Sequence, residues 1–357
     1  MNSLPLGVSP YSVNLPRHAL KKMIRVVRDL QSLSEQTSYI QQLNDLPPSA
    51  QLSISHFSVM MGYDFHLTEE QQVKLIEVNT NTGGLGFACQ SLPNPTPLFT
   101  DKIAQKLLAN FLNEYRLFHQ DNTTATPKLI AIIDEQPERQ FLYAEMQQFQ
   151  QLFEQAGIKT VIIDPSDLTS QAGQLYFENQ HIDLIYNRHC DFYFDSPDMQ
   201  IVNQAWQQQS VCITPNPRHY GLLADKRRII DWSTHYAADL HNTMPNTSLL
   251  ASHDKDTLWK TKKQWVFKPI NSYASRGVYV GEKLTKTKFN SLDPDTTLVQ
   301  QRIKPSITLS PEGEKFKTDF RLFVYRDQIL AVTARLYQGQ VTNLRTPNGG
   351  FSRIKII

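Results

Sequence analysis

Cysteine is scarce in this sequence, with Cys89, Cys190 and Cys212 the only three in 357 residues and no Cys-x-x-Cys pair among them. This spacing argues against a zinc site or a disulfide framework and fits a reducing cytoplasm. Apolar runs are short, and none approaches the roughly 20 residues that a membrane span needs, so we expect no membrane partner. Residues 1–22 also lack the charged, apolar and small-residue order of a secretory signal.

An excess of charge of one sign is missing as well. The 36 Lys and Arg residues nearly balance the 34 Asp and Glu residues, which gives a formal net charge of +2. A nucleic-acid-binding protein would show a basic block, so we expect no nucleic-acid partner. A hydrophobic content of 40% and a charged content of 20% are typical of a globular protein, and 357 residues can bury two or three cores.

The spacing of apolar residues predicts helices at 17–35, 100–118 and 138–157. After a polar break at 119–127, continuous apolar segments at 128–134, 159–165 and 181–188 alternate with helical sequence. This alternation predicts a parallel α/β layer. In the last third, 264–284 predicts a strand, a small-residue loop and a second strand, and 296–303 predicts another strand. Residues 319–350 predict antiparallel strands with a hairpin near Arg326 and Asp327.

The segment "FKPINSYASRGV" places Lys268 on a strand and follows it with Ser272, Ser275 and Gly277. Small side chains let backbone N–H groups approach a phosphate, and a neighbouring lysine supplies a point charge. The pattern is not the Walker sequence, and a flexible hairpin with a surface lysine is the alternative.

The segment "DFRLFV" places Asp319 and Arg321 two residues apart, on one side of a strand, and Arg335 ends the partner strand. Such charges usually lie on the surface. The dense apolar runs beside both arginines instead place them at the rim of a core.

The stretch "GYDFHLTEEQQVKLIEVNTNTGG" (62–84) predicts two strands that carry acidic and amide side chains. Glu77 and Asn79 alternate with Val78, so both face one side, and Asp64 lies on the neighbouring strand. Mg²⁺ prefers oxygen ligands, often one or two carboxylates together with substrate phosphates. We predict a magnesium site. The alternative is a solvated hairpin. That alternative is unfavourable, because "VNTNTGG" contains residues that disfavour strands and a solvated hairpin gains no packing in return.

The order of "ADK", "FKP", "LVQQRI", "DFRLFVYRDQILAVTAR" and "TNLRTPNGG" resembles the ATP-grasp superfamily. The likeness is to its glutathione-synthetase-like members and to the enzymes that ligate glutamate onto a ribosomal protein. It implies two α+β lobes that clasp ATP, with magnesium on the triphosphate. It also implies ligation of a carboxylate to an amine or thiol through an acyl-phosphate.

In such ligases the domain ends with an Asp strand and a Glu-x-Asn strand, but here these lie near the start. The resemblance therefore implies a circular permutation, as in glutathionylspermidine synthetase-like proteins. The expected fold is α/β and α+β multidomain: an ATP-grasp fold plus a preceding parallel α/β domain. The large lobe takes its metal-binding part from 17–92 and its remainder from 300–357. The substrate domain is 119–212, and the small lobe with its phosphate loop is 213–299.

The resemblance also implies a role for each matching residue. The nucleotide-binding set is Lys226, Lys268, Ser272, Ser275, Gly277, Asn343 and the hinge residues Gln300, Gln301 and Ile303. The metal set is Asp64, Glu77 and Asn79. The catalytic set is Arg321 and Arg335, and the substrate set is Arg188 and Arg345.

Two positions depart from the pattern of the relatives. Gln301 stands where many have an acidic hinge residue, so ribose or adenine contacts differ. Thr342 stands where an arginine often precedes the asparagine, and Arg345 is the candidate replacement. Arg188 is expected to pair bidentately with a substrate carboxylate, whereas a structural role is expected for His189.

The leading hypothesis is an ATP- and Mg²⁺-dependent carboxylate–amine ligase with small-molecule acid and amine substrates. The alternatives are a small-molecule kinase on the same fold and a non-catalytic ATP sensor. The sequence leaves the two substrates and the oligomeric state open, a homodimer included.

Overall fold

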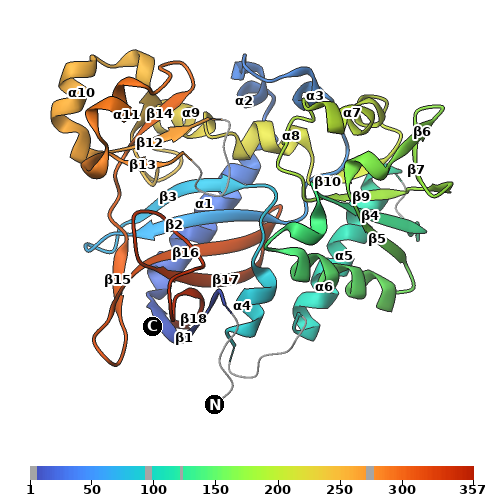
Figure 1. Ribbon diagram of the computed structural model, residues 1–357, viewed down its shortest axis with the longest axis horizontal. Coiled ribbons are helices and arrows are strands. Elements are labelled where there is room, and N and C mark those ends of the chain that lie inside the picture. The colour runs from blue at the N-terminus through green and yellow to red at the C-terminus, as the bar shows by residue number, and fades with distance from the viewer. Residues whose placement is uncertain (1–5, 93–98, 121–123, 271–276) are drawn as a thin grey trace.

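The structure, a computed structural model, describes residues 6–92, 99–120, 124–270 and 277–357. Figure 1 shows a central sheet with a parallel sheet to its right and a smaller antiparallel sheet at the upper left. Within the ranges just given, no helix combines the length and the apolar character needed to cross a membrane.

Early and late segments of the chain share the central sheet. Its strands, in spatial order, are β1 (Val8–Leu15), β18 (Gly350–Ile356), β17 (Gln328–Tyr337), β16 (Lys315–Tyr325), β2 (Met61–Leu67) and β3 (Val73–Asn79), with β15 (Ser306–Leu309) paired to β16. β2 pairs antiparallel with β16, and β1 pairs parallel with β18. The sequence predicted the meeting of β2 with the late strands, but β1 was not predicted.

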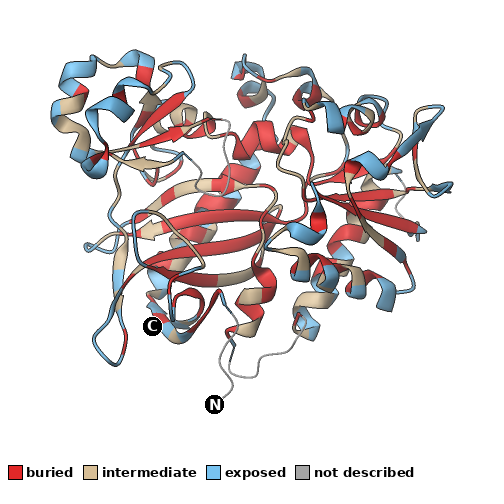
Figure 2. Cartoon of the chain, in the orientation of Figure 1, coloured by how far each residue is buried: buried red, intermediate tan, exposed pale blue. Residues whose placement is uncertain are grey.

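The two faces of this sheet differ because successive side chains on a strand point to opposite sides. On one face Tyr63, Phe65 and Leu322 are fully buried and belong to the core cluster that includes Met23 and Val27 of α1 (Arg17–Ser34). Figure 2 shows buried residues concentrated in these strands and in the helix behind them. The residues between, among them Asp64 and Arg321, face the other way.

The predicted parallel layer is present. Its strands, in spatial order, are β10 (Cys212–Thr214), β9 (Leu184–Asn187), β4 (Leu129–Ile133) and β5 (Lys159–Ile163). Its principal helices are α5 (Asp101–Phe118), α6 (Tyr143–Gln155) and α7 (Gln200–Gln207). Phe111 of α5 and Phe149 of α6 each lie 4.9 Å from the ring of Tyr186, centroid to centroid, which fixes both helices against one face. A meander of β6 (Thr169–Gln171), β7 (Gln174–Phe177) and β8 (Gln180–His181) borders this unit.

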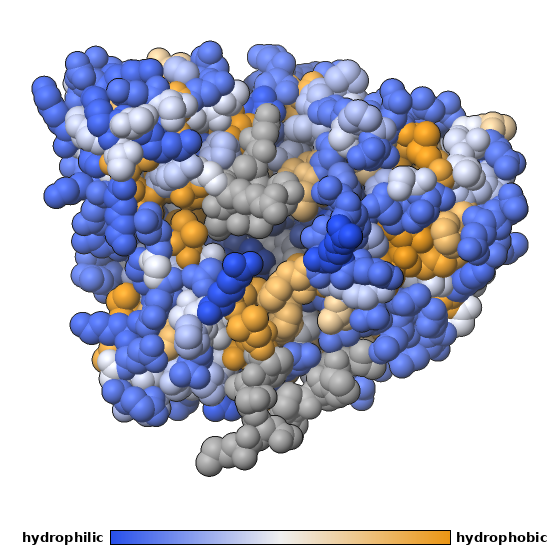
Figure 3. Space-filling view, in the orientation of Figure 1, coloured by the Kyte–Doolittle hydropathy of each residue, from blue (hydrophilic) through white to orange (hydrophobic). Residues whose placement is uncertain are grey.

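The antiparallel sheet forms what we term the small lobe, together with α10 (Lys255–Thr261) and α11 (Lys286–Asn290). Its strands, in spatial order, are β11 (Thr247–Leu249), β14 (Thr297–Gln301), β12 (Trp265–Pro269) and β13 (Tyr279–Val280). Phe267, Phe289 and Val299 are fully buried in its core. Its surface over α10 and α11 is mostly hydrophilic (Figure 3).

Short helices complete the chain: α2 (Thr37–Gln42), α3 (Pro48–Gln51), α4 (Leu85–Gln90), α8 (Pro217–His219), a π-helical turn at Tyr220–Ala224, and α9 (Arg228–His235). Ser272 and Ser275, predicted to close over phosphates, lie outside the described residues. The division of the chain into lobes and a substrate domain at 17–92, 119–212, 213–299 and 300–357 stays a prediction.

Candidate functional site

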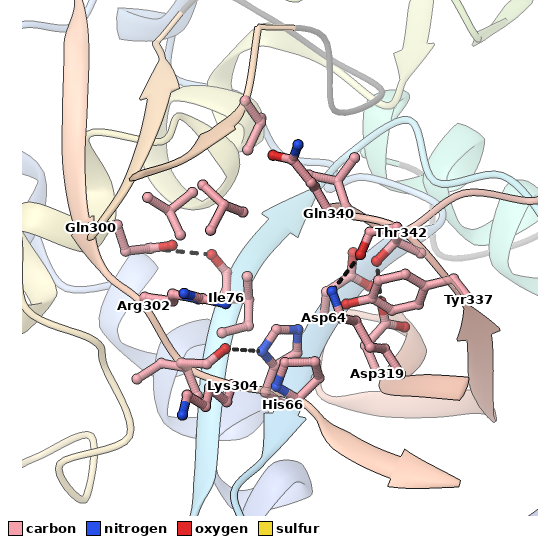
Figure 4. A pocket seen from close by; sticks show the side chains of 18 of the residues that line it. Asp64, His66, Ile76, Gln300, Arg302, Lys304, Asp319, Tyr337, Gln340 and Thr342 are labelled. Carbon is pink, nitrogen blue, oxygen red and sulfur yellow. Dashed lines mark hydrogen bonds between the residues drawn. The ribbon is translucent and has the colours of Figure 1, made fainter. Parts of the chain in front are cut away.

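A cavity of about 420 Å³ lies between the small lobe and the polar face of the central sheet. Figure 4 shows side chains from both sheets converging on it. Seven of the predicted site residues line it: Asp64, Glu77, Lys268, Gln300, Gln301, Ile303 and Arg335. The structure therefore brings together residues separated by more than two hundred positions in sequence.

The register of the central sheet aligns the predicted metal ligands. Asp64 lies directly opposite Glu77 on β3 and opposite Arg321 on β16. Residues paired in this way point to the same face. The Asn79 amide nitrogen lies 3.4 Å from a carboxylate oxygen of Asp64 and 3.4 Å from one of Glu77. All three predicted ligands thus converge at one edge of the cavity.

Four charged side chains form a buried network beside this edge. Arg321 donates from Nε and Nη2 to the two carboxylate oxygens of Asp64 at 2.6 and 2.5 Å. Nη2 of Arg335 lies 3.0 Å from Asp64 Oδ2, and its Nε donates to Asp319 at 2.7 Å. Thr342 donates to the second oxygen of Asp319 at 2.5 Å. Both arginines are therefore anchored to buried carboxylates, and Arg335 lines the cavity.

Burial and charge oppose one another in this network. Burial by itself raises the pKa of Asp64, but Arg321 and Arg335 outweigh it and hold that pKa below the ordinary 3.8. Burial acts to lower the pKa of Arg335, but Asp319 and Asp64 raise it above its usual value. Both shifts favour the charged forms of Asp64 and Arg335.

Two lysine ammonium groups, those of Lys226 and Lys268, lie close enough to Glu77 to feel its charge. Lys268 donates to the Ile76 carbonyl at 3.4 Å, and Lys226 donates to the Ile270 carbonyl at 3.4 Å. Burial lowers the pKa of Lys268, the attraction of Glu77 raises it, and the repulsion of Lys226 lowers it further. Burial also lowers the pKa of Lys226. A polyanion placed between them would relieve this repulsion.

The predicted hinge residues line the cavity: Gln300 and Gln301 lie on β14, and Ile303 lies just after it. Gln300 donates from its side chain to the Ile76 carbonyl at 3.5 Å, and the Gln301 backbone N–H donates to Asn246 at 2.7 Å. The Ile303 carbonyl accepts from His66 Nδ1 at 2.9 Å. The apolar side chains of Ile76, Val266, Val278 and Val280 line the same part of the cavity. An apolar slot beside backbone amides suits a planar base.

The loop after β3 is held by the central sheet and by the parallel α/β unit. Arg321 donates to the Gly83 carbonyl at 3.2 Å, and Arg188 donates to the Thr82 carbonyl at 3.1 Å. The backbone N–H groups of Gly84 and Gly86 donate to the buried Glu145 carboxylate at 2.9 and 3.0 Å. These amides are therefore already satisfied by the chain itself.

Seven of the predicted residues that the structure describes are not among those lining the cavity: Asn79, Arg188, Lys226, Gly277, Arg321, Asn343 and Arg345. Arg188 is buried and donates to the Tyr186 hydroxyl at 3.2 Å. Burial by itself lowers the pKa of Arg188, but Tyr186, Glu145 and Asp134 outweigh burial and raise that pKa. Asn343 organises its own loop, donating to the Gln338 carbonyl at 2.8 Å. Arg345 is exposed, and its backbone N–H donates to Asn343. Gly277 follows the undescribed segment with a φ of +69°, which favours glycine.

Sequence reasoning missed two residues at this site. His66 could have been found, because it lies two positions after Asp64 and so shares its face. Glu145 had no local signal, since its role depends on α6 packing against a loop some sixty residues earlier.

No protein-family model and no curated protein sequence matches the chain. Among solved structures, a glutathione synthetase-like effector from Globodera pallida aligns with a TM-score of 0.60 and 12% identity, over 98% of this chain and 90% of that one. A putative gamma-glutamylcysteine synthetase from Methylobacillus flagellatus KT aligns with a TM-score of 0.54 and 10% identity, over 94% and 87%. The chain thus shares the fold of these glutathione synthetase-like and glutamylcysteine synthetase-like structures, as the sequence resemblance predicted, and its parallel α/β unit lies within the matched length.

Proposed function

We propose that this protein is an ATP-dependent carboxylate–amine ligase that works through an acyl-phosphate and releases ADP and phosphate. The observation that carries the proposal is the bidentate contact of Arg321 with Asp64, 257 positions apart in sequence, at the edge of a cavity that also holds Lys268 and the hinge. This contact also supports a circularly permuted lobe, in which 17–92 completes what 300–357 begins.

The residues present fit a magnesium ion. Asp64 and Glu77 offer carboxylate oxygen atoms within one small region, with the Asn79 amide nitrogen 3.4 Å from an oxygen of each. Mg²⁺ typically takes one or two carboxylates together with substrate phosphates. Among the described parts of the chain no group of three or more His, Cys, Asp and Glu side chains could hold a metal. In this proposal the substrate phosphates and Asn79 would complete the ligand set. The ion would neutralise charge on the triphosphate.

The remaining residues would act by position and charge. Lys226 and Lys268 would hold the phosphates, with Ser272, Ser275 and Gly277 over them, and the hinge would hold adenine. The substrate carboxylate attacks the γ-phosphorus, the bond to the β-phosphate oxygen breaks, and ADP leaves. The amine then attacks the acyl carbon and displaces phosphate. Arg321 and Arg335 would stabilise the negative charge that develops in both steps.

The acid and amine would enter from the parallel α/β unit. Arg188 directly follows β9, which lies next to β4 where the strand order of that sheet reverses. Ligands of open α/β sheets bind at such a point. We propose Arg188 as a contact for a substrate carboxylate. Arg345 and Asn343 would contribute from the loop after β17.

The test is a screen for ADP release with Mg-ATP against pools of amino acids, small peptides and polyamines. A ligase releases ADP and free phosphate only when acid and amine are both present, whereas a kinase leaves the phosphate on its substrate. Glu77→Ala should abolish ADP release without loss of the fold. Unchanged ADP release in Glu77→Ala would overturn the mechanism.

A further inference from the structure

A single peptide joins the parallel α/β unit to the central sheet beside the candidate site. It is the peptide between Gly83 and Gly84, in the loop after β3. Its N–H group donates to the Glu145 carboxylate on α6, at 2.9 Å to Oε2 and 3.1 Å to Oε1. Its carbonyl oxygen accepts from Nη1 of Arg321 on β16 at 3.2 Å. Because a peptide is planar, these bonds lie at opposite ends of one rigid group.

This close approach requires glycine at both positions. A Cβ atom on Gly83 would lie 2.2 Å from a side-chain carbon of Leu142 and 2.8 Å from Nη2 of Arg188. Gly84 has a φ of +99°, a conformation that favours glycine, and a Cβ there would lie 2.1 Å from the Phe351 ring. The absence of side chains therefore lets the peptide reach Glu145 on one side and Arg321 on the other.

Glu145 is a buried carboxylate for which the proposed mechanism has no role. Its side chain belongs to a residue only 4% exposed, and Oε2 also accepts from the Gly86 N–H at 3.0 Å. A buried N–H group left without an acceptor costs about 1–3 kcal/mol, so Glu145 fixes the loop strongly. The carboxylate thus determines the position of the Gly83–Gly84 peptide.

The series of hydrogen bonds ends at a proposed metal ligand. Arg321 uses its other nitrogen atoms, Nε and Nη2, on the two carboxylate oxygens of Asp64. The donors of a guanidinium lie in a fixed fork, so an orientation set at Nη1 also sets where Nε and Nη2 point. The Gly83 carbonyl therefore orients Arg321, and Arg321 orients the Asp64 carboxylate. Hydrogen bonds in such a series also polarise one another.

We propose that Glu145 is a positioning residue for the phosphate and metal end of the site, acting through the Gly83–Gly84 peptide on Arg321 and Asp64. The inference rests on the proposed function, since it needs Mg-ATP at Asp64. It makes this end of the site depend on the docking of α6. The parallel unit, which carries Arg188, thereby also aligns the groups that receive the phosphates.

The test compares calorimetric titrations of the full chain with ATP in excess magnesium and with ATP in EDTA. The ratio of the two affinities, which we term the magnesium factor, reports on the end of the site at Asp64. Glu145→Leu should lower this factor about five- to tenfold, as expected for one lost hydrogen bond, and should change the affinity in EDTA by less than about twofold.

Two conservative variants grade the effect. Glu145→Asp is one methylene shorter and reaches the amides less well, so it should lower the magnesium factor about two- to fivefold. Glu145→Gln keeps a carbonyl acceptor for the Gly84 and Gly86 amides and should retain most of the factor. Gln150→Leu is the matched control, because Gln150 also lies on α6 and donates to a backbone carbonyl, that of Thr160 on β5. It should leave the factor unchanged.

A magnesium factor that is unchanged in Glu145→Leu would overturn the inference. So would an equal loss of affinity in magnesium and in EDTA, which a merely structural role predicts. If Glu145→Leu does not fold, an unchanged factor in Glu145→Asp would overturn it instead. Wild-type protein that binds ATP equally well with and without magnesium would overturn the inference together with the metal site. Wild-type protein that fails to bind ATP in either condition would overturn the proposed function itself.

Discussion

The contact between Asp64 and Arg321 can be measured by a double-mutant cycle with Asp64→Asn, Arg321→Gln and the double variant. Both side chains are buried, and they share two hydrogen bonds of 2.6 and 2.5 Å. Removing one partner of a buried pair leaves an uncompensated charge, so each single variant should lose about 3–5 kcal/mol of unfolding free energy. Because the second change then removes a group already without its partner, the coupling energy should be about 2–3 kcal/mol.

Urea unfolding at pH 7, followed by fluorescence, gives the four free energies. The matched control is the pair Lys286 and Asp256, which is 3.8 Å apart with side chains 47% and 83% exposed. An exposed pair of this kind should show a coupling energy below about 0.5 kcal/mol. If the buried pair also gives an additive result within about 0.5 kcal/mol, the two segments are not in contact.

The pH dependence of the same cycle has a definite sign. The pKa of Asp64 in the folded state is below its ordinary 3.8, because the two arginines outweigh the effect of burial. Its stabilising contribution is therefore complete above pH 3.8 and lost as the pH falls further. The coupling energy should be equal at pH 7 and pH 5 and should shrink only in stronger acid. A decline that begins near neutrality would contradict this account.

Two other substitutions test the site and its support. Lys268→Met should keep or raise the melting temperature without ligand, because burial lowers the pKa of Lys268 and its charge costs stability. It should weaken ATP binding roughly tenfold to a hundredfold in calorimetry, whereas Lys255→Met, an exposed change on α10, should not. Glu114→Gln should gain stability relative to wild type as the pH rises. Burial raises the pKa of Glu114 from 4.5 to about 7, so ionisation above pH 4.5 costs the folded wild type about 3 kcal/mol by pH 8. Melting temperatures from pH 4.5 to 8 check this, and a constant difference would contradict it.

Much of the fold follows from local patterns in the sequence. Continuous apolar runs identified the strands of the parallel sheet, and helical spacing identified α1, α5 and α6. The convergence of Asp64 with Arg321 was predictable because each segment carries a recognisable motif and period-two alternation fixes the side each residue faces. β1 could not be predicted, since its eight residues include Pro10 and alternate weakly, and only the edge of β18 makes them a strand.

The site was predicted less completely than the fold. Residues on strands, such as Glu77 and Lys268, lie where the alternation placed them. Asn343 lies in a loop whose conformation depends on hydrogen bonds that the side chain itself makes. The Gly84 and Gly86 amides donate to Glu145, whose approach depends on how α6 packs.

The pairing of β2 with β16 has a consequence for synthesis on the ribosome. The β2–β3 hairpin is complete once residue 79 has been made, yet the strand that covers its open edge ends at residue 325. A chain growing at about 5–20 residues per second would leave that edge uncovered for roughly ten seconds or more. During this interval the Asp64 carboxylate has no arginine partner, and a charge on the hairpin guards against the association that an exposed edge invites.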